Sequence, residues 1–255
     1  MSETPPREPE QQPQAPLIEH LIELRSRLVK AVVLILAIFA ALYAFSNDIY
    51  SFVADPLMAL LPAGSQMIAT EVASPFLAPF KLTLFAALFI AVPFVLYQAW
   101  AFVAPGLYRH EKALAFPLLA SSILLFYAGV AFAYFVVFPL LFDFFVHTGP
   151  ENVAVMTDIN QYLNFVLKLF FAFGAAFEIP IATFLMIWTG ATSVESLSKK
   201  RPYVIVGCFV IGMMMTPPDV VSQSLLAIPM WLLFEVGILF GRLVRRRRHD
   251  PEADT

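Results

Sequence analysis

Residues 113–142 read ALAFPLLASSILLFYAGVAFAYFVVFPLLF, a run of 30 residues without one charged side chain. About 20 apolar residues suffice for a helix to cross a bilayer, so we expect a spanning helix here that is tilted or extends past the membrane. The whole chain shares this bias, since 60% of its 255 residues are apolar, 14% are charged and 26 are Phe. This composition excludes a soluble enzyme, a nucleic-acid-binding module and a disordered protein.

Five more apolar stretches accompany this one, at 31–45, 82–103, 162–188, 202–216 and 222–241. The first continues a helix that begins after Pro16, because leucines recur at helical spacing from residue 17 onward. The runs are continuous rather than alternating, which excludes an outer-membrane β-barrel. We therefore predict an all-α membrane protein with six transmembrane helices.

The last two stretches are short for transmembrane helices. A helix of about 15 residues rises about 22 Å, whereas the hydrocarbon core measures roughly 30 Å. We therefore expect that the bilayer thins locally around this hairpin, or that the hairpin is re-entrant. In both cases the chain returns to the side that it left.

Positive charges are divided unequally between the two sets of loops. Of the 16 Lys and Arg residues, all but Lys81 and Lys168 fall in one set, namely Arg7, Arg25, Arg27, Lys30, Arg109, Lys112, Lys199, Lys200, Arg201, Arg242, Arg245, Arg246, Arg247 and Arg248. The opposite loops carry acids instead: Asp48, Asp55, Glu71, Asp143, Glu151, Asp158 and Asp219. Since cytoplasmic loops are enriched in Lys and Arg, we predict that both termini are cytoplasmic.

Three segments are expected along the chain. Residues 1–16 hold five prolines among Glu and Gln, and such a stretch buries too little apolar area to become ordered. We expect a disordered cytoplasmic arm there rather than a cleavable signal peptide, because a polar stretch precedes a long span. Residues 17–241 form the transmembrane domain. Residues 242–255 form a basic cytoplasmic tail, whose arginine run at 245–248 contacts anionic lipid.

Ionisable residues inside the predicted spans need polar or charged neighbours, because a charge in the membrane interior is costly. Glu178 lies near the middle of the fourth span, so it should face the bundle interior, water or a partner; a hydrogen-bonded structural carboxyl is the alternative. Lys168 lies about 15 Å away along a helix, too far to pair with Glu178 directly, and its stem can snorkel toward the outer interface. In the sixth span, Glu235 is expected to reach toward Arg242.

Two acids, Glu23 and Glu111, lie among the basic residues of the predicted cytoplasmic side. One interpretation is local ion pairing, for example of Glu23 with Arg27 at i,i+4 spacing, worth a few tenths of a kcal/mol. The other is that two acids from different elements converge on a cationic ligand. Guanidinium groups suit such a site, because each carboxylate can accept two parallel hydrogen bonds from one of them.

No catalytic motif is present in the sequence. It has no glycine-rich phosphate loop, nucleophile elbow or zinc-protease motif, its four histidines are scattered, and its single Cys208 lies in an apolar run. We expect no enzymatic activity, no cofactor, no metal and no nucleic-acid partner.

Soft and polar groups gather at the outer end of the last two spans. Met213, Thr216 and Gln223 could bond another membrane helix or fill a narrow hairpin. The pattern Gly237-x-x-x-Gly241 in the sixth span allows close helix packing, although such spacings often arise by chance.

Seven strings of the sequence resemble the TatC subunits of twin-arginine protein translocases. They are HLIELRSRL (20–28), MIATEVASPF (67–76), YQAWAFVAPGLYRHEK (97–112), SSILLFYAGVAFAYFVVFPL (121–140), FAFGAAFEIP (171–180), KKRPYV (199–204) and GMMMTPPDVVSQSLLAIPM (212–230). The likeness covers about residues 17–241 in order. It implies a concave, glove-like bundle of six helices in the bacterial cytoplasmic (inner) membrane, with both termini inside.

The resemblance also implies a function and a site. The family binds signal peptides with paired arginines through two acids, which match Glu23 and Glu111 here. Arg25, Gln98 and Phe102 fall in the same strings. Glu178 matches the polar group of the family's concave face, and Pro56, in the first outer loop, matches a position needed for assembly.

Partners are implied by the same resemblance. Met213, Thr216 and Gln223 match the region where the family docks the single-span subunits TatA and TatB. The other partners implied are precursor proteins with twin-arginine signal peptides, membrane lipids and further copies of the chain.

Our hypothesis from the sequence is recognition in two steps. An arginine pair docks on Glu23 and Glu111, and the apolar part of the signal peptide then moves along the concave face toward Glu178. The resemblance implies that the proton gradient drives export of folded proteins. One alternative is a proton-coupled small-solute secondary transporter that uses Glu178 as relay, although no convincing internal repeat supports it. Another is a membrane scaffold without a client site.

Overall fold

The computed structural model describes residues 15–60, 67–103, 112–147, 157–216 and 219–249. Side chains are described for 21–54, 67–102, 116–145, 157–216 and 219–243. All regular elements within these ranges are helical, and extended backbone pairs there only in an isolated bridge between Ile68 and Asp158. The predicted all-α class is confirmed.

The helices follow one another along the chain without intervening sheet in the described ranges. They are α1 (Ala15–Leu42), the 3₁₀ turn η1 (Tyr43–Phe45), α2 (Ser46–Leu60), α3 (Ser74–Val103), α4 (Lys112–Phe132), the π-helical segment η4 (Ala133–Val137), α5 (Phe138–His147), α6 (Ile159–Ala176), α7 (Ile179–Trp188), α8 (Val194–Lys199), α9 (Arg201–Met215) and α10 (Val220–His249).

Five helical stretches of the described chain are long and apolar enough to cross a membrane: Leu21–Ala54, Ser74–Phe102, Phe116–Phe145, Ile159–Trp188 and Val220–Leu243. The sixth predicted span is α9, which has 15 residues and is therefore as short as expected. The prediction that the last span is also short was wrong, because α10 extends over 30 residues. Its helix continues through the arginine run, which hydropathy alone had separated from the span.

Three of the long stretches depart from simple α-helices. In the first, the 3₁₀ turn η1 separates α1 from α2. In the third, η4 adds a π-helical segment between α4 and α5. In the fourth, α6 ends at Ala176 and α7 begins at Ile179, which leaves Phe177 and Glu178 at the break. Pro180 has no N–H to donate to the preceding turn, so an uninterrupted α-helix cannot run through it with all its hydrogen bonds.

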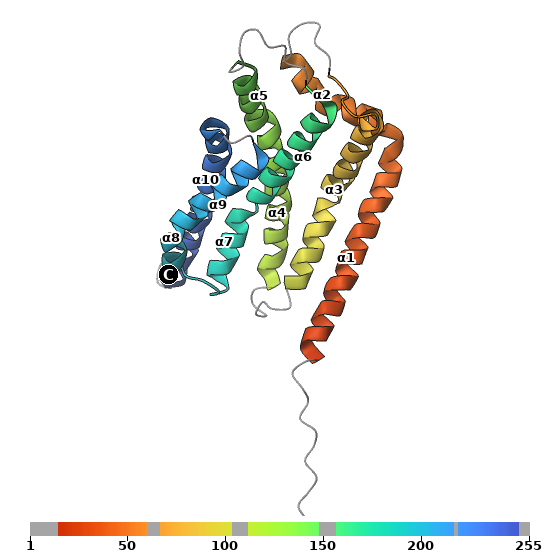
Figure 1. The fold of residues 1–255 in the computed structure, drawn as a ribbon. Coiled ribbons are helices and arrows are strands. Elements are labelled where there is room, and N and C mark those ends of the chain that lie inside the picture. Colours follow the sequence, from red (N-terminus) through yellow and green to blue (C-terminus); the bar gives the residue numbers. More distant parts are fainter. Residues whose placement is uncertain (1–14, 61–66, 104–111, 148–156, 217–218, 250–255) are drawn as a thin grey trace, which may run out of the picture.

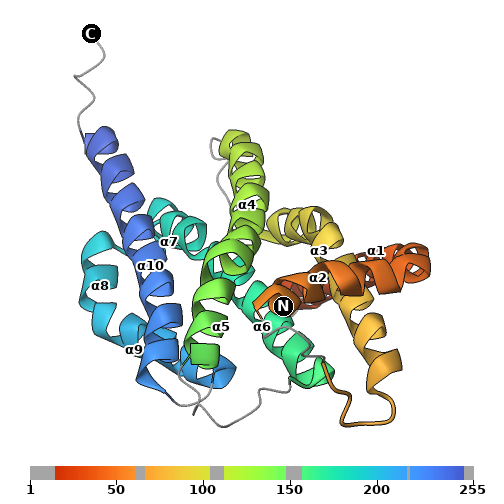
Figure 2. The ribbon, with the colours of Figure 1, turned by 90° about the horizontal axis from the view of Figure 1, so that it is seen from above.

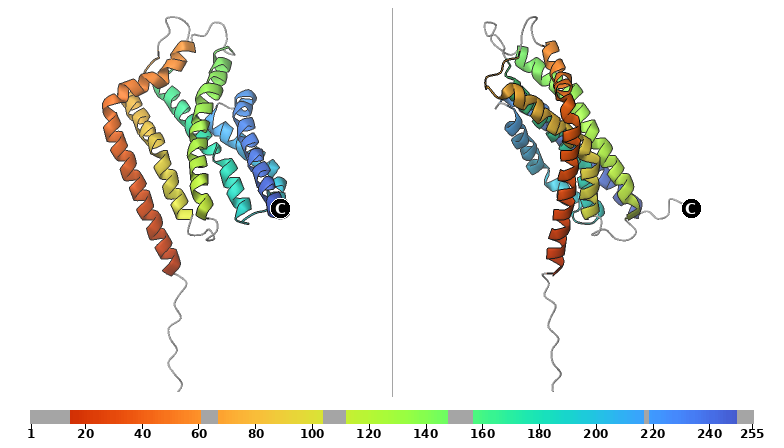
Figure 3. Two further views of the ribbon diagram at one scale, coloured as in Figure 1. Left: turned by 180° about the vertical axis from the view of Figure 1, so that it is seen from behind. Right: turned by 90° about the vertical axis from the view of Figure 1, so that its right-hand side faces the viewer.

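The helices form a bundle with two distinct ends (Figure 1). At one end, which we call the basic end, lie the start of α1, the end of α3, the start of α4, α8 and the end of α10. At the other, which we call the acidic end, lie α2, the end of α5 and the start of α6 (Figure 3). The first and last described residues therefore lie at the same end, as the charge distribution predicted.

Helix α6 lies at the centre of the bundle, between α1 and α3 on one side and α9 and α10 on the other (Figure 2). Its side chains Leu163, Leu169 and Phe173 are fully buried against residues such as Phe138 and Leu226. By contrast α1 packs mainly on α3, and most of its apolar side chains are exposed. In a bilayer, these exposed side chains would contact lipid or another protein.

Glycines allow helices to approach one another closely at several positions. A side chain at Gly129 of α4 would overlap the backbone carbonyl of Phe173 in α6. Gly237 of α10 faces Pro180 and Thr183 of α7, and a Cβ there would lie 2.8 Å from the Thr183 Cβ. The Gly237-x-x-x-Gly241 pattern thus packs α10 against α7 within the chain.

Glu235 on α10 pairs with Arg201 at the start of α9, where Nη2 donates to Oε2 over 2.6 Å. The expected reach toward Arg242 was wrong, because Arg242 instead donates to the Ser198 hydroxyl at 3.3 Å. The hairpin places Arg201 opposite Glu235 across 34 residues of chain, and spacing along one helix cannot reveal such a neighbour.

Candidate functional site

At the basic end, Arg27 joins α1 to the last turns of α3. Its Nε donates to Oε1 of Glu23 at 2.9 Å, which is the i,i+4 contact that the sequence predicted. Its Nη1 donates to Oε1 of Gln98 and its Nη2 to the carbonyl of Ala101, both at 3.2 Å. One guanidinium thus holds a carboxylate, an amide and a backbone carbonyl from two helices.

The other residues predicted for this site differ in how far they are exposed to solvent. Gln98 and Phe102 are half-buried on α3, whereas Arg25 is exposed on α1. Glu111 lies outside the described residues. The structure therefore brings Glu23 and Gln98 together. Sequence reasoning missed that Arg27 bridges the two helices, although the i,i+4 spacing had already marked it as the partner of Glu23.

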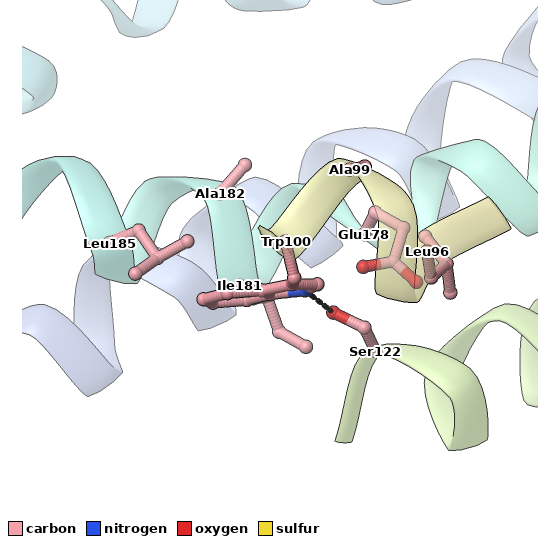
Figure 4. A pocket seen from close by; sticks show the side chains of 8 residues that line it. All are labelled: Leu96, Ala99, Trp100, Ser122, Glu178, Ile181, Ala182 and Leu185. Carbon is pink, nitrogen blue, oxygen red and sulfur yellow. Dashed lines mark hydrogen bonds between the residues drawn. The ribbon is translucent and has the colours of Figure 1, made fainter. Parts of the chain in front are cut away.

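Glu178, the one site residue predicted for the middle of the fourth span, lies at the break between α6 and α7 (Figure 4). The carboxyl group lines a hollow of about 180 Å³ together with Leu96, Ala99, Trp100, Ser122, Ile181, Ala182 and Leu185. Trp100 Nε1 donates to the Ser122 hydroxyl at 3.3 Å inside this hollow. The polar groups beside Glu178 come from α3 (Trp100) and α4 (Ser122). The apolar side chains come from α3 and α7.

Glu178 is incompletely satisfied in this position. Its Oε1 is buried and has no hydrogen-bond partner among the described residues. An unpaired buried carboxylate oxygen is costly, so the hollow calls for a donor such as water or a group of a bound partner. The volume is large enough for several water molecules, each of which occupies roughly 30 Å³ in the liquid.

A larger hollow of about 360 Å³ lies among α2, α3, α4 and α6. Its lining consists of apolar and aromatic side chains, including Phe52, Phe89 and Phe170. The π-helical segment η4 contributes Tyr134 and Phe135 to this wall. On α3, the residues lining the two hollows follow one another at helical spacing, so one face of α3 borders both: Leu82, Ala86, Phe89, Leu96 and Trp100.

The acidic end holds a cluster of a different kind around Asp158. This residue caps α6, since its Oδ1 accepts from the backbone N–H groups of Asn160 and Gln161 at 2.9 and 3.0 Å. Its Oδ2 accepts from the Thr70 backbone and hydroxyl at 3.0 and 2.7 Å. These bonds hold the pKa of Asp158 at about 2, with the Thr70 hydroxyl as the largest cause.

Sequence reasoning recorded Asp158 only as one charge of an outer loop. Its place directly before an apolar run could have identified it as a helix cap. The contact with Thr70 spans 88 residues and has no local signal.

The residues expected to dock partner subunits differ in their exposure. Met213 is 53% exposed on α9. Thr216 is buried at the end of α9, and its hydroxyl donates to the Gly212 carbonyl at 3.0 Å. Gln223 is half-buried on α10. Pro56 lies within helix α2 rather than in a loop, and its side chain is outside those described.

No group of three or more His, Cys, Asp and Glu residues that could hold a metal ion occurs in the described part of the chain. Cys208 is a buried free thiol. The fold and the site instead define a multi-pass membrane protein whose polar groups lie at one end of a helical bundle and in hollows between its helices.

The comparison with protein families specifies this class. Residues 19–229 match the family model "Sec-independent protein translocase protein (TatC)". The chain therefore belongs to the TatC family and is a component of the twin-arginine protein translocase. The resemblance seen in the seven sequence strings is confirmed.

Individual relatives agree with this assignment. The Sec-independent protein translocase protein TatC of Azotobacter chroococcum mcd 1 is 63% identical over 246 residues, which are 96% of each chain. That of Escherichia coli (strain K12) is 60% identical over 227 residues, covering 89% of this chain and 88% of the relative. A crystal structure described as the twin arginine translocase receptor TatC superposes with a TM-score of 0.80 at 38% identity, covering 89% of this chain and all of the other.

Proposed function

We propose that this chain is the receptor for twin-arginine signal peptides within its translocase, and that it has no catalytic activity of its own. It acts in the bacterial cytoplasmic membrane with its basic end toward the cytoplasm, where precursor proteins arrive folded. The observation that carries this proposal is the carboxylate of Glu23, which already holds a guanidinium group at the edge of the bundle.

The Glu23 carboxylate has capacity for a second guanidinium. Both bonds from Arg27 go to Oε1, and Oε2 has no partner among the described residues. The side chain is 37% exposed, so a ligand can reach it from solution. An arginine of the signal peptide would then share the carboxylate with Arg27 or replace it.

Glu111 supplies the second acid of the proposed site. It directly precedes Lys112, the first residue of α4, and α4 begins at the basic end near the last turn of α3 (Figure 1). Gln98 and Phe102 lie on those last turns of α3 and would border the peptide. Two acids from different segments of the chain would suit a ligand with two adjacent cations, since each arginine can occupy its own carboxylate.

The hollow at Glu178 provides a place for the apolar part of the signal peptide. It is lined by apolar side chains of α3 and α7, and the unpaired Glu178 oxygen would accept a hydrogen bond from the peptide backbone or from water. Exposed Met213 on α9, with Gln223 on α10, would form part of the surface on which TatA, TatB or a further copy docks. Because the sequence has no nucleotide-binding loop, the proton gradient would supply the energy for transport.

Photocrosslinking to precursors tests the receptor function. A crosslinker placed at Leu24, beside the proposed site, should capture a precursor with an Arg-Arg pair and capture the Lys-Lys version several-fold less, because lysine offers a point charge instead of a planar pair of donors. Replacing both acids, Glu23→Gln with Glu111→Gln, should abolish the difference. Equal capture of both precursors by the wild-type chain would contradict the proposal.

A further inference from the structure

One side of the fourth span forms a continuous exposed stripe. On α6 the exposed residues are Gln161, Asn164, Lys168, Phe171 and Ala175, at alternating spacings of three and four. The same spacing continues on α7 through Ala182 and Met186, with half-buried Glu178 in register between them. Such spacing places the α6 residues of this stripe on one face of that helix.

The half of this stripe near the acidic end is polar. Among the described residues, the side chains of Gln161, Asn164 and Lys168 have no hydrogen-bond or ion-pair partner, and all three are exposed. They lie on a helix that is otherwise apolar enough to span a membrane. Because an ammonium group facing lipid hydrocarbon is costly, this face needs an anionic or hydrated partner.

The short length of the neighbouring helix α9 indicates that lipid headgroups can reach Lys168. Helix α9 contacts α6, and its 15 residues rise about 22 Å against a hydrocarbon core of roughly 30 Å. Lipid beside so short a helix thins to match it, which lowers the headgroups toward the middle of the membrane. Lys168 lies nine residues beyond the start of α6, or about 14 Å along its axis, so lowered headgroups come within reach of its flexible stem.

We propose that Lys168, together with Asn164 and Gln161, binds the phosphate of an anionic phospholipid from the leaflet at the acidic end. The three side chains offer one positive charge and several N–H donors, and a phosphodiester offers one negative charge and only acceptors. The lipid would cover the polar half of the exposed stripe and keep the lysine charge in a polar environment. This site is separate from the cluster at Arg27, and its existence does not depend on the proposed receptor function.

Native mass spectrometry of the delipidated full-length chain tests the site, with phosphatidylglycerol and phosphatidylcholine as probes. The wild type should retain one phosphatidylglycerol more tightly than phosphatidylcholine. Lys168→Met should weaken phosphatidylglycerol binding about tenfold, the effect of roughly one lost charge-assisted hydrogen bond. Lys168→Arg should keep the binding within about twofold, which also shows that the position tolerates substitution.

Lys81 provides the matched control. Like Lys168 it lies within a span, half-buried on α3, and Lys81→Met should leave phosphatidylglycerol binding unchanged. Equal losses in the two methionine variants, or no loss in Lys168→Met, would overturn the proposal. So would equal affinity for phosphatidylcholine, which would show that the anionic charge is not recognised.

Two further measurements separate the lipid from other sources of the same chemistry. Glycerol phosphate added in excess should not displace the bound lipid, whereas displacement would identify a soluble phosphate as the ligand and overturn the lipid assignment. In native membranes, a photocrosslinker at Asn164 should yield lipid adducts. Adducts with a protein helix instead would show that the stripe binds a partner subunit, and would likewise overturn it.

Discussion

Glu23 at the basic end and Asp158 at the acidic end differ in how much of their hydrogen-bonding capacity the fold uses. Asp158 accepts four hydrogen bonds from Thr70, Asn160 and Gln161 and is buried. Glu23 is partly exposed and receives the bonds of one side chain, Arg27, on a single oxygen. A carboxylate offers about four acceptor positions, so the fold saturates Asp158 and leaves Glu23 with spare capacity.

This difference separates a structural acid from a binding acid. The bonds of Asp158 join the start of α6 to the segment before α3, where Ile159 N–H also donates to the Ile68 carbonyl at 3.0 Å. Those of Glu23 stay within α1, and only Arg27 extends the cluster to α3. Substitutions at the two ends should therefore affect different properties of the protein.

The largest expected effect is on peptide binding at the basic end. Glu23→Gln should weaken the binding of a twin-arginine signal peptide by roughly tenfold to a hundredfold, because a hydrogen bond to a charged group contributes about 1.5–3 kcal/mol. Equilibrium titration of the purified chain with a fluorescent peptide measures the change.

Two controls define the meaning of that loss. Asp158→Asn at the opposite end should bind the peptide as the wild type does. Glu195→Gln, which changes an exposed acid of α8 on the far side of the basic end, should also have no effect (Figure 1). A loss of similar size in either control would mean that overall charge or folding, and not Glu23, determines binding.

At the acidic end the expected effect is on stability. Asp158→Ala removes the cap of α6 and both contacts with Thr70, and should lower the apparent unfolding temperature in detergent by about 2–4 °C. Thr70→Val should produce a smaller decrease, since the backbone bonds to Asn160 and Gln161 remain. An unchanged unfolding temperature in Asp158→Ala would contradict a structural role.

Local patterns explain why the sequence predicted some of these features and not others. Hydropathy is evaluated for each stretch of sequence by itself. It therefore identified the apolar spans, but it could not show that helix α10 continues through its arginines. The Glu23–Arg27 pair was predictable because i,i+4 neighbours meet on any helix.

The features that were missed depend on contacts between distant parts of the chain. The Thr70–Asp158 and Arg201–Glu235 contacts join residues that only the folded bundle brings together. The break at Glu178 did have a local signal in Pro180, which lacks the N–H that an unbroken helix needs. Its consequence, a carboxyl group in a hollow shared by three helices, required the packing of α3 and α4 against α7.

Acid should reveal the stabilising contribution of Asp158. Hydrogen bonds from Thr70 and the start of α6 lower the pKa of Asp158 from 3.8 to about 2. A lowered pKa means that this residue stabilises the fold fully above about pH 4, and that the contribution disappears as the pH falls toward 2. The difference in unfolding temperature between wild type and Asp158→Asn should thus stay constant from about pH 8 to 5 and shrink only below 4. Shrinkage already between pH 7 and 5 would contradict the low pKa.

The smallest expected effects concern Arg27, which connects the binding acid to the fold. Arg27→Gln should lower the unfolding temperature by less than about 2 °C, because partly exposed ion pairs contribute at most about 1 kcal/mol. The same change removes a positive charge that competes with the arginines of the peptide for Glu23, so peptide affinity should rise about twofold to threefold. Arg27→Lys keeps the charge and should leave the affinity near that of the wild type. A fall in affinity in Arg27→Gln would instead show that Arg27 positions the Glu23 carboxylate, and the spare capacity of this acid would then depend on the contact with α3.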